Sequence, residues 1–230
     1  MKTVITTAVL ATACGFASAA TYNDATNDLF ENGFAHLDIA SVEMTNDATW
    51  LYISVTARGD LDSSNWGKYA LGIDNGQGGP SDNSNGWGRN IDWGRGITHW
   101  TATWADDGGS GAGGEVYAYT GSWSLLGATW MGSANISATD AGHAAGTQTW
   151  QILLSDLGVG IGDTFFFDVI TTANGGGDPG VDHLSRADQA TSDWSVQSVS
   201  GDFLSYTVVP APGALALVGV GGLVAARRRR

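Results

Sequence analysis

Hydrophobic and polar residues alternate with a period of two along most of the chain between residues 21 and 207. In the segment 50–56 (WLYISVT), Leu51, Ile53 and Val55 alternate with aromatic or hydroxyl-bearing residues. Because the side chains of a strand point alternately to its two faces, this pattern predicts a strand with one buried face. Similar patterns predict strands at 36–44, 68–74, 98–104, 115–120, 123–126, 147–154, 165–170 and 202–208.

The segments between these strands are rich in Gly, Asn, Asp and Ser, and no long stretch has helical periodicity. Many short strands joined by such turns predict an all-β fold, an antiparallel β-sandwich of jelly-roll or immunoglobulin-like type, over residues 21–207. The residues expected in its core are Leu51, Ile53, Val55, Phe165, Phe167 and Val169, or their alternating partners. Two long loops, near 75–91 and 173–193, are the expected places for a binding site.

The first 20 residues have the order of a secretory signal peptide. Lys2 precedes an apolar segment at 4–16, and residues 17–19 (ASA) supply small side chains for cleavage. This order predicts an N-terminal signal helix that directs export through the Sec machinery and is removed near residue 20. Cys14 is the only cysteine and would leave with this segment, so the exported domain would contain no disulfide and no cysteine-ligated metal.

The C-terminal segment 208–230 combines a proline motif, an apolar stretch and a basic cluster. Residues 213–226 have no polar side chain and predict a helix of about 21 Å, a marginal span for a bilayer core of about 30 Å. The arginines at 227–230 would stay on the cytoplasmic side and leave the domain outside. We therefore expect transient anchoring in the inner membrane, followed by a location at the cell surface or outside the cell.

This layout resembles the PEP-CTERM protein-sorting tail. The resemblance rests on Pro210, Pro212, Gly213, Arg227, Arg228, Arg229 and Arg230, with alanine at 211 where the family has glutamate. It implies cleavage near residues 210–213 by an exosortase-like enzyme. It also implies a bacterium that makes extracellular polysaccharide, which would then be a partner of the exported domain.

A second resemblance lies within the predicted domain. The segments 38–57 (DIASVEMTNDATWLYISVTA), 65–76 (NWGKYALGIDNG) and 162–172 (GDTFFFDVITT) are similar to DOMON-like and family-nine carbohydrate-binding sandwiches. The electron-transfer members of these groups need haem ligands, and the chain has no c-type haem motif. The resemblance therefore implies a non-catalytic carbohydrate-binding module.

The predicted domain is strongly acidic. Lys2 and the four terminal arginines lie in the two end segments, whereas all 23 acidic residues lie between them. Five basic residues against 23 acidic ones give the domain a formal net charge of −18. A surface of this charge repels nucleic acid, so we expect a neutral ligand or a cation as its partner.

Ten tryptophans are candidate platforms for sugar rings, because an indole offers a flat apolar face beside a polar N–H group. The strand patterns place Trp50, Trp100, Trp104 and Trp150 in strands, where we expect them to pack. The predicted ligand-binding residues are Trp66, Lys68, Trp87, Arg89, Asp92 and Trp93, which lie in or beside glycine-rich loops. A binding module should place at least two of these three loop tryptophans in one cleft or on one face. A structural envelope or matrix protein, the alternative function, should bury them separately.

Two acidic loops are candidate calcium sites, because calcium accepts six to eight oxygen ligands in loose geometry. Asp74 and Asp82 belong to one loop, and Asp178 and Asp182 belong to the other. The alternative is a solvated turn in which the side chains bond the local backbone. The histidines have no zinc-motif spacing. Ser110 lies in GGSGA, which does not match a nucleophile elbow, so we predict no catalytic residue and regard a glycan-active hydrolase as the less favoured alternative.

Overall fold

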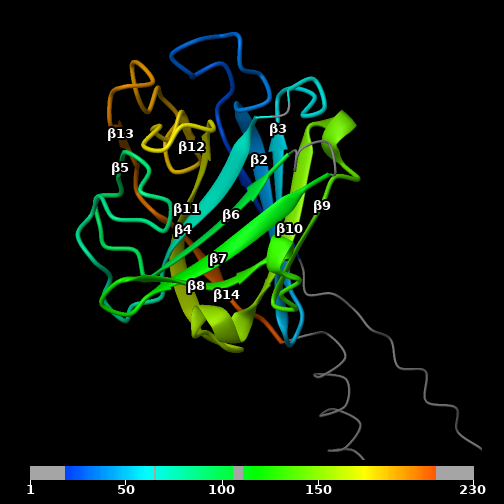
Figure 1. Cartoon of the computed structure of the whole chain (residues 1–230), viewed down its shortest axis with the longest axis vertical. Helices are drawn as coiled ribbons and strands as arrows, with labels where there is room; N and C mark the ends of the chain where they lie inside the picture. Colours follow the sequence, from blue (N-terminus) through cyan, green and yellow to red (C-terminus); the bar gives the residue numbers. More distant parts are fainter. Residues whose placement is uncertain (1–18, 65, 106–110, 211–230) are drawn as a thin grey trace, which may run out of the picture.

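The computed structural model describes residues 19–64, 66–105 and 111–210, which form a sandwich of two antiparallel sheets (Figure 1). The first sheet has the order β1-β2-β3-β10-β9, from β1 (Ala20–Asn23), β2 (Ile39–Asn46), β3 (Trp50–Ala57), β10 (Thr147–Leu153) and β9 (Ile136–Thr139). The second has the order β12-β11-β4-β6-β7-β8, from β12 (Asp182–His183), β11 (Thr164–Thr172), β4 (Lys68–Asp74), β6 (His99–Trp104), β7 (Gly113–Tyr119) and β8 (Trp123–Ala128). Its seventh strand, β14 (Leu204–Thr207), also pairs with β11.

The remaining regular elements are short. β5 (Ile91–Asp92) and β13 (Ser198–Val199) form a parallel pair, and η1 (Thr129–Met131), η2 (His143–Ala145) and η3 (Leu154–Leu157) are single 3₁₀ turns. The prediction of an all-β sandwich is thereby confirmed. Within the described ranges no helix has the length and apolarity needed to cross a bilayer. The predicted signal helix, up to residue 18, and the sorting tail from residue 211, with its apolar stretch 213–226 and its arginines 227–230, lie outside the described residues.

The main core lies between the two sheets and is built from the alternating positions that the sequence marks. Leu51, Ile53 and Val55 of β3 are fully buried and pack with Phe165 and Phe167 of β11. Tyr69, Leu71 and Ile73 of β4 belong to the same cluster. Burying each of these side chains contributes about 1.5–3 kcal/mol, so this cluster is the principal source of stability.

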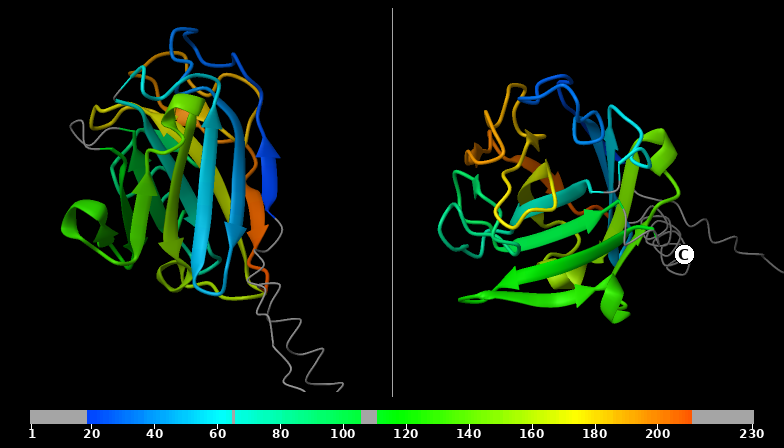
Figure 2. Two further views of the ribbon diagram at one scale, coloured as in Figure 1. Left: turned by 90° about the vertical axis from the view of Figure 1, so that its right-hand side faces the viewer. Right: turned by 45° about the horizontal axis from the view of Figure 1, so that its top comes forward.

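The seven-stranded sheet is also covered on its outer face, where long loops fold over it (Figure 2). Trp93, from the loop between β4 and β6, packs on Ile97 and Trp100 and is 1% exposed. Gly72 of β4 makes room for it, since a Cβ atom there would lie 3.0 Å from Cζ3 of Trp93. This second cluster explains why both faces of β4 and β6 are rich in apolar residues.

Strand register defines two opposite ends of the sandwich. Lys68 pairs with Thr172 at one end, whereas Thr164 pairs with Thr207 at the other. The strand β11 that links these pairs rises about 3.3 Å per residue, which separates the two ends by about 26 Å. The 173–181 loop lies at the Lys68 end, because Asp182 pairs with Thr171 there. The 24–38 loop lies at the same end, because the Thr171 hydroxyl donates to the carbonyl of Leu37.

The domain extends slightly beyond its predicted boundary at residue 207. Val208 is fully buried in the main core, and the side chain of Asn46 bonds both the N–H and the carbonyl of Val209. Asn46 also accepts a hydrogen bond of 2.7 Å from the Tyr206 hydroxyl. Val208 and Val209 therefore belong to the sandwich and not to the apolar tail segment.

Candidate functional site

A hollow on the outer face of the seven-stranded sheet follows from the sizes of the side chains in three neighbouring rows. One row contains Lys68 and Trp104, paired across β4 and β6. Gly113 of β7 completes this first row. The second row contains Ala70, Ala102 and Glu115, and the third contains Gly72 and the bulky Trp100 and Tyr117. Small residues between bulky ones leave the sheet surface recessed around Glu115.

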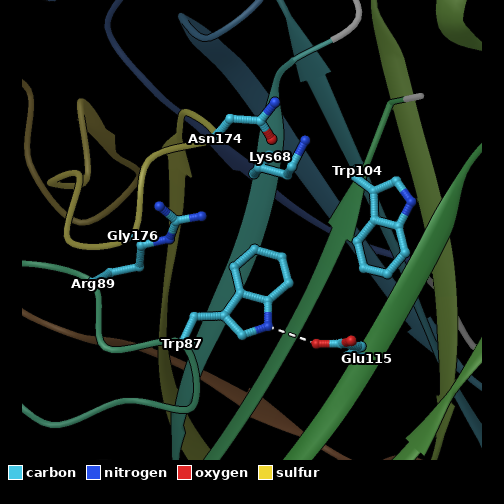
Figure 3. Close-up of a pocket in the computed structure, with 7 residues that line it drawn as sticks. All are labelled: Lys68, Trp87, Arg89, Trp104, Glu115, Asn174 and Gly176. Carbon is cyan, nitrogen blue, oxygen red and sulfur yellow. Dashed lines mark hydrogen bonds between the residues drawn. The ribbon is translucent and has the colours of Figure 1, made fainter. Parts of the chain in front are cut away.

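The hollow is a pocket of about 420 Å³, a volume typical of small-ligand sites (Figure 3). The residues that line it are Lys68, Trp87, Arg89, Trp104, Glu115, Asn174 and Gly176. Trp87 and Trp104 are both partly exposed, and their ring centroids lie 6.2 Å apart with planes inclined at 35°. The two indoles therefore form an angled aromatic wall along one side of a polar floor.

Local turn chemistry brings Trp87 to the sheet. The side chain of Asn85 accepts the N–H of Arg89 and donates to its carbonyl, which closes the loop around Trp87. Gly86 then lies directly on the sheet, since a Cβ atom there would approach Trp100 to 2.8 Å. Loop closure and the missing side chain together fix the height at which Trp87 stands above β6 and β7.

Glu115 organises the aromatic side chains around it. Its Oε2 accepts hydrogen bonds from Trp87 Nε1 at 2.7 Å and from the Tyr117 hydroxyl at 2.9 Å. Its Oε1 accepts a third bond, of 2.8 Å, from Nε1 of Trp130, which is 62% exposed. Burial and the neighbouring Glu115 carboxylate raise the pKa of Tyr117 to about 12, so its hydroxyl stays protonated as a donor. Glu115 thus holds three rings in place before any ligand arrives.

The opposite side of the pocket is polar and partly cationic. Arg89 lies with its guanidinium carbon 5.3 Å from the centroid of the Trp87 ring, donates to the carbonyl of Gly175, and lies 4.0 Å from Asp178. Burial lowers the pKa of Arg89, with the Asp178 charge opposing that effect. Lys68 and Asn174 complete this side (Figure 3). The pocket therefore offers donors and acceptors facing an aromatic wall.

The structure brings together only half of the predicted ligand-binding set. Lys68, Trp87 and Arg89 line this pocket. Trp93 is buried in the outer cluster, so its prediction as a ligand residue is wrong. Asp92 lies beside a different hollow of about 370 Å³, together with Asp82, and its carboxylate accepts the N–H of Gly94.

Trp66 lies away from this pocket, in a third apolar cluster at the same end of the sandwich. It borders a separate hollow of about 580 Å³ with His36 and Phe34. Its ring meets those of His36, Phe34 and Trp194 edge to face, with centroids 4.6, 5.4 and 6.1 Å away. Because three rings of the protein already pack against the Trp66 indole, we regard Trp66 as part of a packing cluster.

The sequence prediction missed four of the residues that line the pocket, namely Trp104, Glu115, Asn174 and Gly176. Trp104 shares a strand face with Trp100, which is buried, and both were expected to pack inside the fold. That face is the outer one, where only part of the sheet is covered by loops. The pattern could have found Trp104 only with the knowledge that its end of β6 lies beyond the loop that covers Trp100.

The predicted calcium loops are not formed as expected. Asp74 pairs with Arg95 at 2.5 Å and accepts the N–H of Gly76. Asp82 is exposed, and Asp178 accepts the N–H of Gly175. The carboxylates of Asp74 and Asp178 therefore act in turns and ion pairs, and that of Asp82 is exposed to solvent. Asp182, the fourth predicted ligand, is buried and lies with Asp28 and Asp38 instead.

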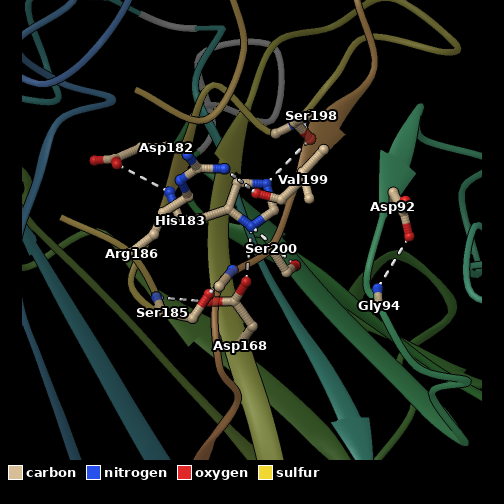
Figure 4. Close-up of polar contacts among 12 residues, drawn as sticks. Asp92, Gly94, Asp168, Asp182, His183, Ser185, Arg186, Ser198, Val199 and Ser200 are labelled. Atoms are coloured by element: carbon tan, nitrogen blue, oxygen red, sulfur yellow. Dashed lines mark hydrogen bonds and ion pairs between the residues drawn. The ribbon is translucent and has the colours of Figure 1, made fainter. Parts of the chain in front are cut away.

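A buried Ser-His-Asp arrangement lies beside β12 (Figure 4). His183 Nδ1 lies 2.7 Å from Oδ2 of Asp168, and its Nε2 lies 3.0 Å from Oγ of Ser198. All three residues are 0% exposed, and Ser198 also accepts the N–H of Gly180. A serine nucleophile must be accessible to its substrate, and Ser198 is fully buried. We therefore interpret this network as a structural tie between β11, β12 and β13.

Comparison with known proteins adds no relative. No protein-family model matches the chain, and neither the curated proteins nor the solved structures include a significant match.

Proposed function

We propose that this protein is an exported carbohydrate-binding module that holds a polysaccharide in the pocket between Trp87 and Trp104. The observation that supports the proposal is the pair of partly exposed indoles beside polar groups, with Trp87 held by its hydrogen bond to Glu115. Sugar rings have apolar faces of C–H groups and polar edges of hydroxyl groups. An aromatic wall with hydrogen-bonding groups opposite it complements both parts.

Preorganisation strengthens the argument. Trp87 is held by its bond to Glu115 and by the guanidinium of Arg89, and its loop is closed by Asn85. A ligand that stacks on such a ring pays little of the entropy of ordering a side chain, which otherwise costs about 0.5–1.5 kcal/mol for each immobilised group. The side of the pocket opposite the indoles supplies an amide at Asn174 and charges at Lys68 and Arg89. These groups suit the hydroxyl or carboxyl groups of sugars.

A polysaccharide array followed by calorimetry with the best ligand tests this proposal. Trp87→Ala and Trp104→Ala should each lower the affinity at least about tenfold, which corresponds to about 1.4 kcal/mol. Trp66→Ala is the matched control, because it removes an equally large, partly buried indole from a different hollow. An equal loss in all three variants would place binding elsewhere or indicate a general loss of structure.

The alternative is a structural envelope or matrix protein without a specific ligand. The burial of Trp93 and the separation of Trp66 from Trp87 favour it, because at least two of these three residues were expected to share one cleft. The Trp87 and Trp104 pair favours binding. Absence of binding to every polysaccharide tested, by a protein with an intact melting transition, would support the structural role.

We also propose that export and sorting follow the two end segments. The signal segment would be removed near residue 20, where β1 begins, and the tail would be cleaved near residues 210–213 by an exosortase-like enzyme. The intact mass of the protein recovered from the cell surface or the medium tests both cleavages. A mass that retains the arginines at 227–230 would contradict cleavage of the tail.

A further inference from the structure

Three aspartates from separate parts of the chain meet at the Lys68 end of the sandwich. Asp28 lies in the loop after β1, Asp38 directly precedes β2, and Asp182 begins β12. They offer carboxylate oxygens that all lie within 4.8 Å of one another. Asp38 and Asp182 are buried, with exposures of 0% and 3%, and Asp28 is partly buried.

Several buried oxygens in this group have no hydrogen-bond partner among the described residues. They are Oδ1 of Asp38, both carboxylate oxygens of Asp28, and Oδ2 of the neighbouring Asp24. The partnered oxygens, in contrast, are well engaged, since Oδ2 of Asp38 accepts from Asn27 N–H and Arg58 Nε. A buried carboxylate oxygen without a donor costs free energy that something else must offset.

The charges in the group are unbalanced. Arg58 lies 2.7 Å from Asp38, and the charge of Arg186 acts on Asp28, so in the described part of the chain the four carboxylates Asp24, Asp28, Asp38 and Asp182 outnumber these cations. A cation bound among these oxygens would offset the excess of negative charge.

We propose that Asp28, Asp38 and Asp182 bind one calcium ion. The available donors are carboxylate oxygens, which are the ligands that calcium prefers. Ligands on opposite sides of calcium lie about 4.6–5.2 Å apart, so oxygens that all lie within 4.8 Å of one another can share one ion. The proposal is independent of the sugar pocket and shares only Asp182 with the calcium loops that the sequence indicated.

The ion would fasten the N-terminal segment to the sandwich. Asp28, Asp38 and Asp182 are each adjacent in sequence to a buried residue of the third apolar cluster, namely Leu29, Leu37 and Val181. Trp66 and Trp194 pack on the same cluster. A bound ion would therefore stabilise this cluster, and a luminescent lanthanide in the site would have two indoles nearby as sensitisers.

The test uses the full-length protein freed of metal with a chelator. Its melting temperature should rise by about 5–10 °C when free calcium is about 100-fold above the dissociation constant. Sodium chloride of equal ionic strength should produce a smaller rise. Terbium should give sensitised emission that calcium displaces. Equal melting temperatures in calcium and in sodium chloride, or a lack of sensitised emission, would overturn the proposal.

Two variants separate a specific site from general charge effects. Asp28→Asn removes one charge without breaking a hydrogen bond of that carboxylate within the described residues, and it should weaken calcium binding at least about tenfold. In chelator it should melt no lower than the parent, because repulsion within the group is reduced. Asp82→Asn removes an exposed charge elsewhere and should bind calcium like the parent. Equal weakening in both variants would refute the assignment.

Discussion

A single methyl group at residue 113 tests whether the orientation of Trp104 controls ligand binding. Gly113 lies in β7 directly opposite Trp104 in β6. A Cβ atom at this position would lie 2.4 Å from Cε2 and Cζ2 of the Trp104 ring. The backbone of Gly113 does not have a positive φ, so alanine fits the chain and the indole must move.

The expected size of the effect follows from this distance. Non-bonded carbon atoms prefer separations of about 3.5–4.0 Å, so the ring must shift by about 1 Å or more. Overpacking costs about 1–3 kcal/mol. Because Trp104 is partly exposed, its ring can swing outward, and we expect Gly113→Ala to lower the free energy of unfolding by about 1 kcal/mol. This corresponds to a fall in the melting temperature of about 2–4 °C.

Binding should suffer much more than stability. A displaced Trp104 no longer forms the aromatic wall with Trp87, so Gly113→Ala should lower the affinity for the array-selected polysaccharide at least about tenfold in calorimetry. The circular dichroism that arises from coupling between the two indoles should change in parallel. Gly114→Ala is the control, because its methyl group would face Ile136 and the core instead. An altered dichroism signal with unchanged affinity would refute the role assigned to Trp104.

Three further predictions concern stability. His183→Ala should lower the free energy of unfolding in urea by about 3–5 kcal/mol, because it leaves the Asp168 carboxylate buried without its partner; a loss below about 1 kcal/mol would contradict the structural tie. Burial lowers the pKa of His99, so the unfolded chain binds protons more readily and stability should fall as the pH drops below about 6.5. A His99→Gln variant should show a weaker fall between pH 7.5 and 5.5, and an unchanged pH profile would refute this. Val208→Ala should cost about 2 kcal/mol and Val209→Ala much less, so equal losses would place Val208 outside the core.

Period-two alternation predicted the sandwich well because the main core uses one face of each strand. Leu51, Ile53 and Val55 are buried as expected, and so are Phe165 and Phe167. Alternation did not predict which residues are buried on the outer face of the seven-stranded sheet, where loops cover it. It could not show that the loop after β4 folds back to bury Trp93, since that depends on the space above Gly72.

The candidate site was predicted in part for a similar reason. Residue type and loop position were enough to identify Trp87, Arg89 and Lys68 as pocket residues. Glu115 could not be found, because its role depends on three hydrogen bonds to rings from different segments. The aspartate group was missed because Asp182 lies far in sequence from Asp28 and Asp38 and meets them only in the folded chain, where its carboxylate accepts the N–H of Ile39.

The pocket and the end of the described chain lie at opposite ends of the sandwich, about 26 Å apart along β11. If the protein is attached to a surface beyond Thr207, neighbouring molecules would present their pockets in one plane above that surface. One long polymer could then engage several pockets at once. Such multivalent contact multiplies a weak single-site affinity by about 10²–10⁴ without any new contact within the molecule. A shallow pocket on a crowded surface could thus retain a polymer that a single molecule in solution would release.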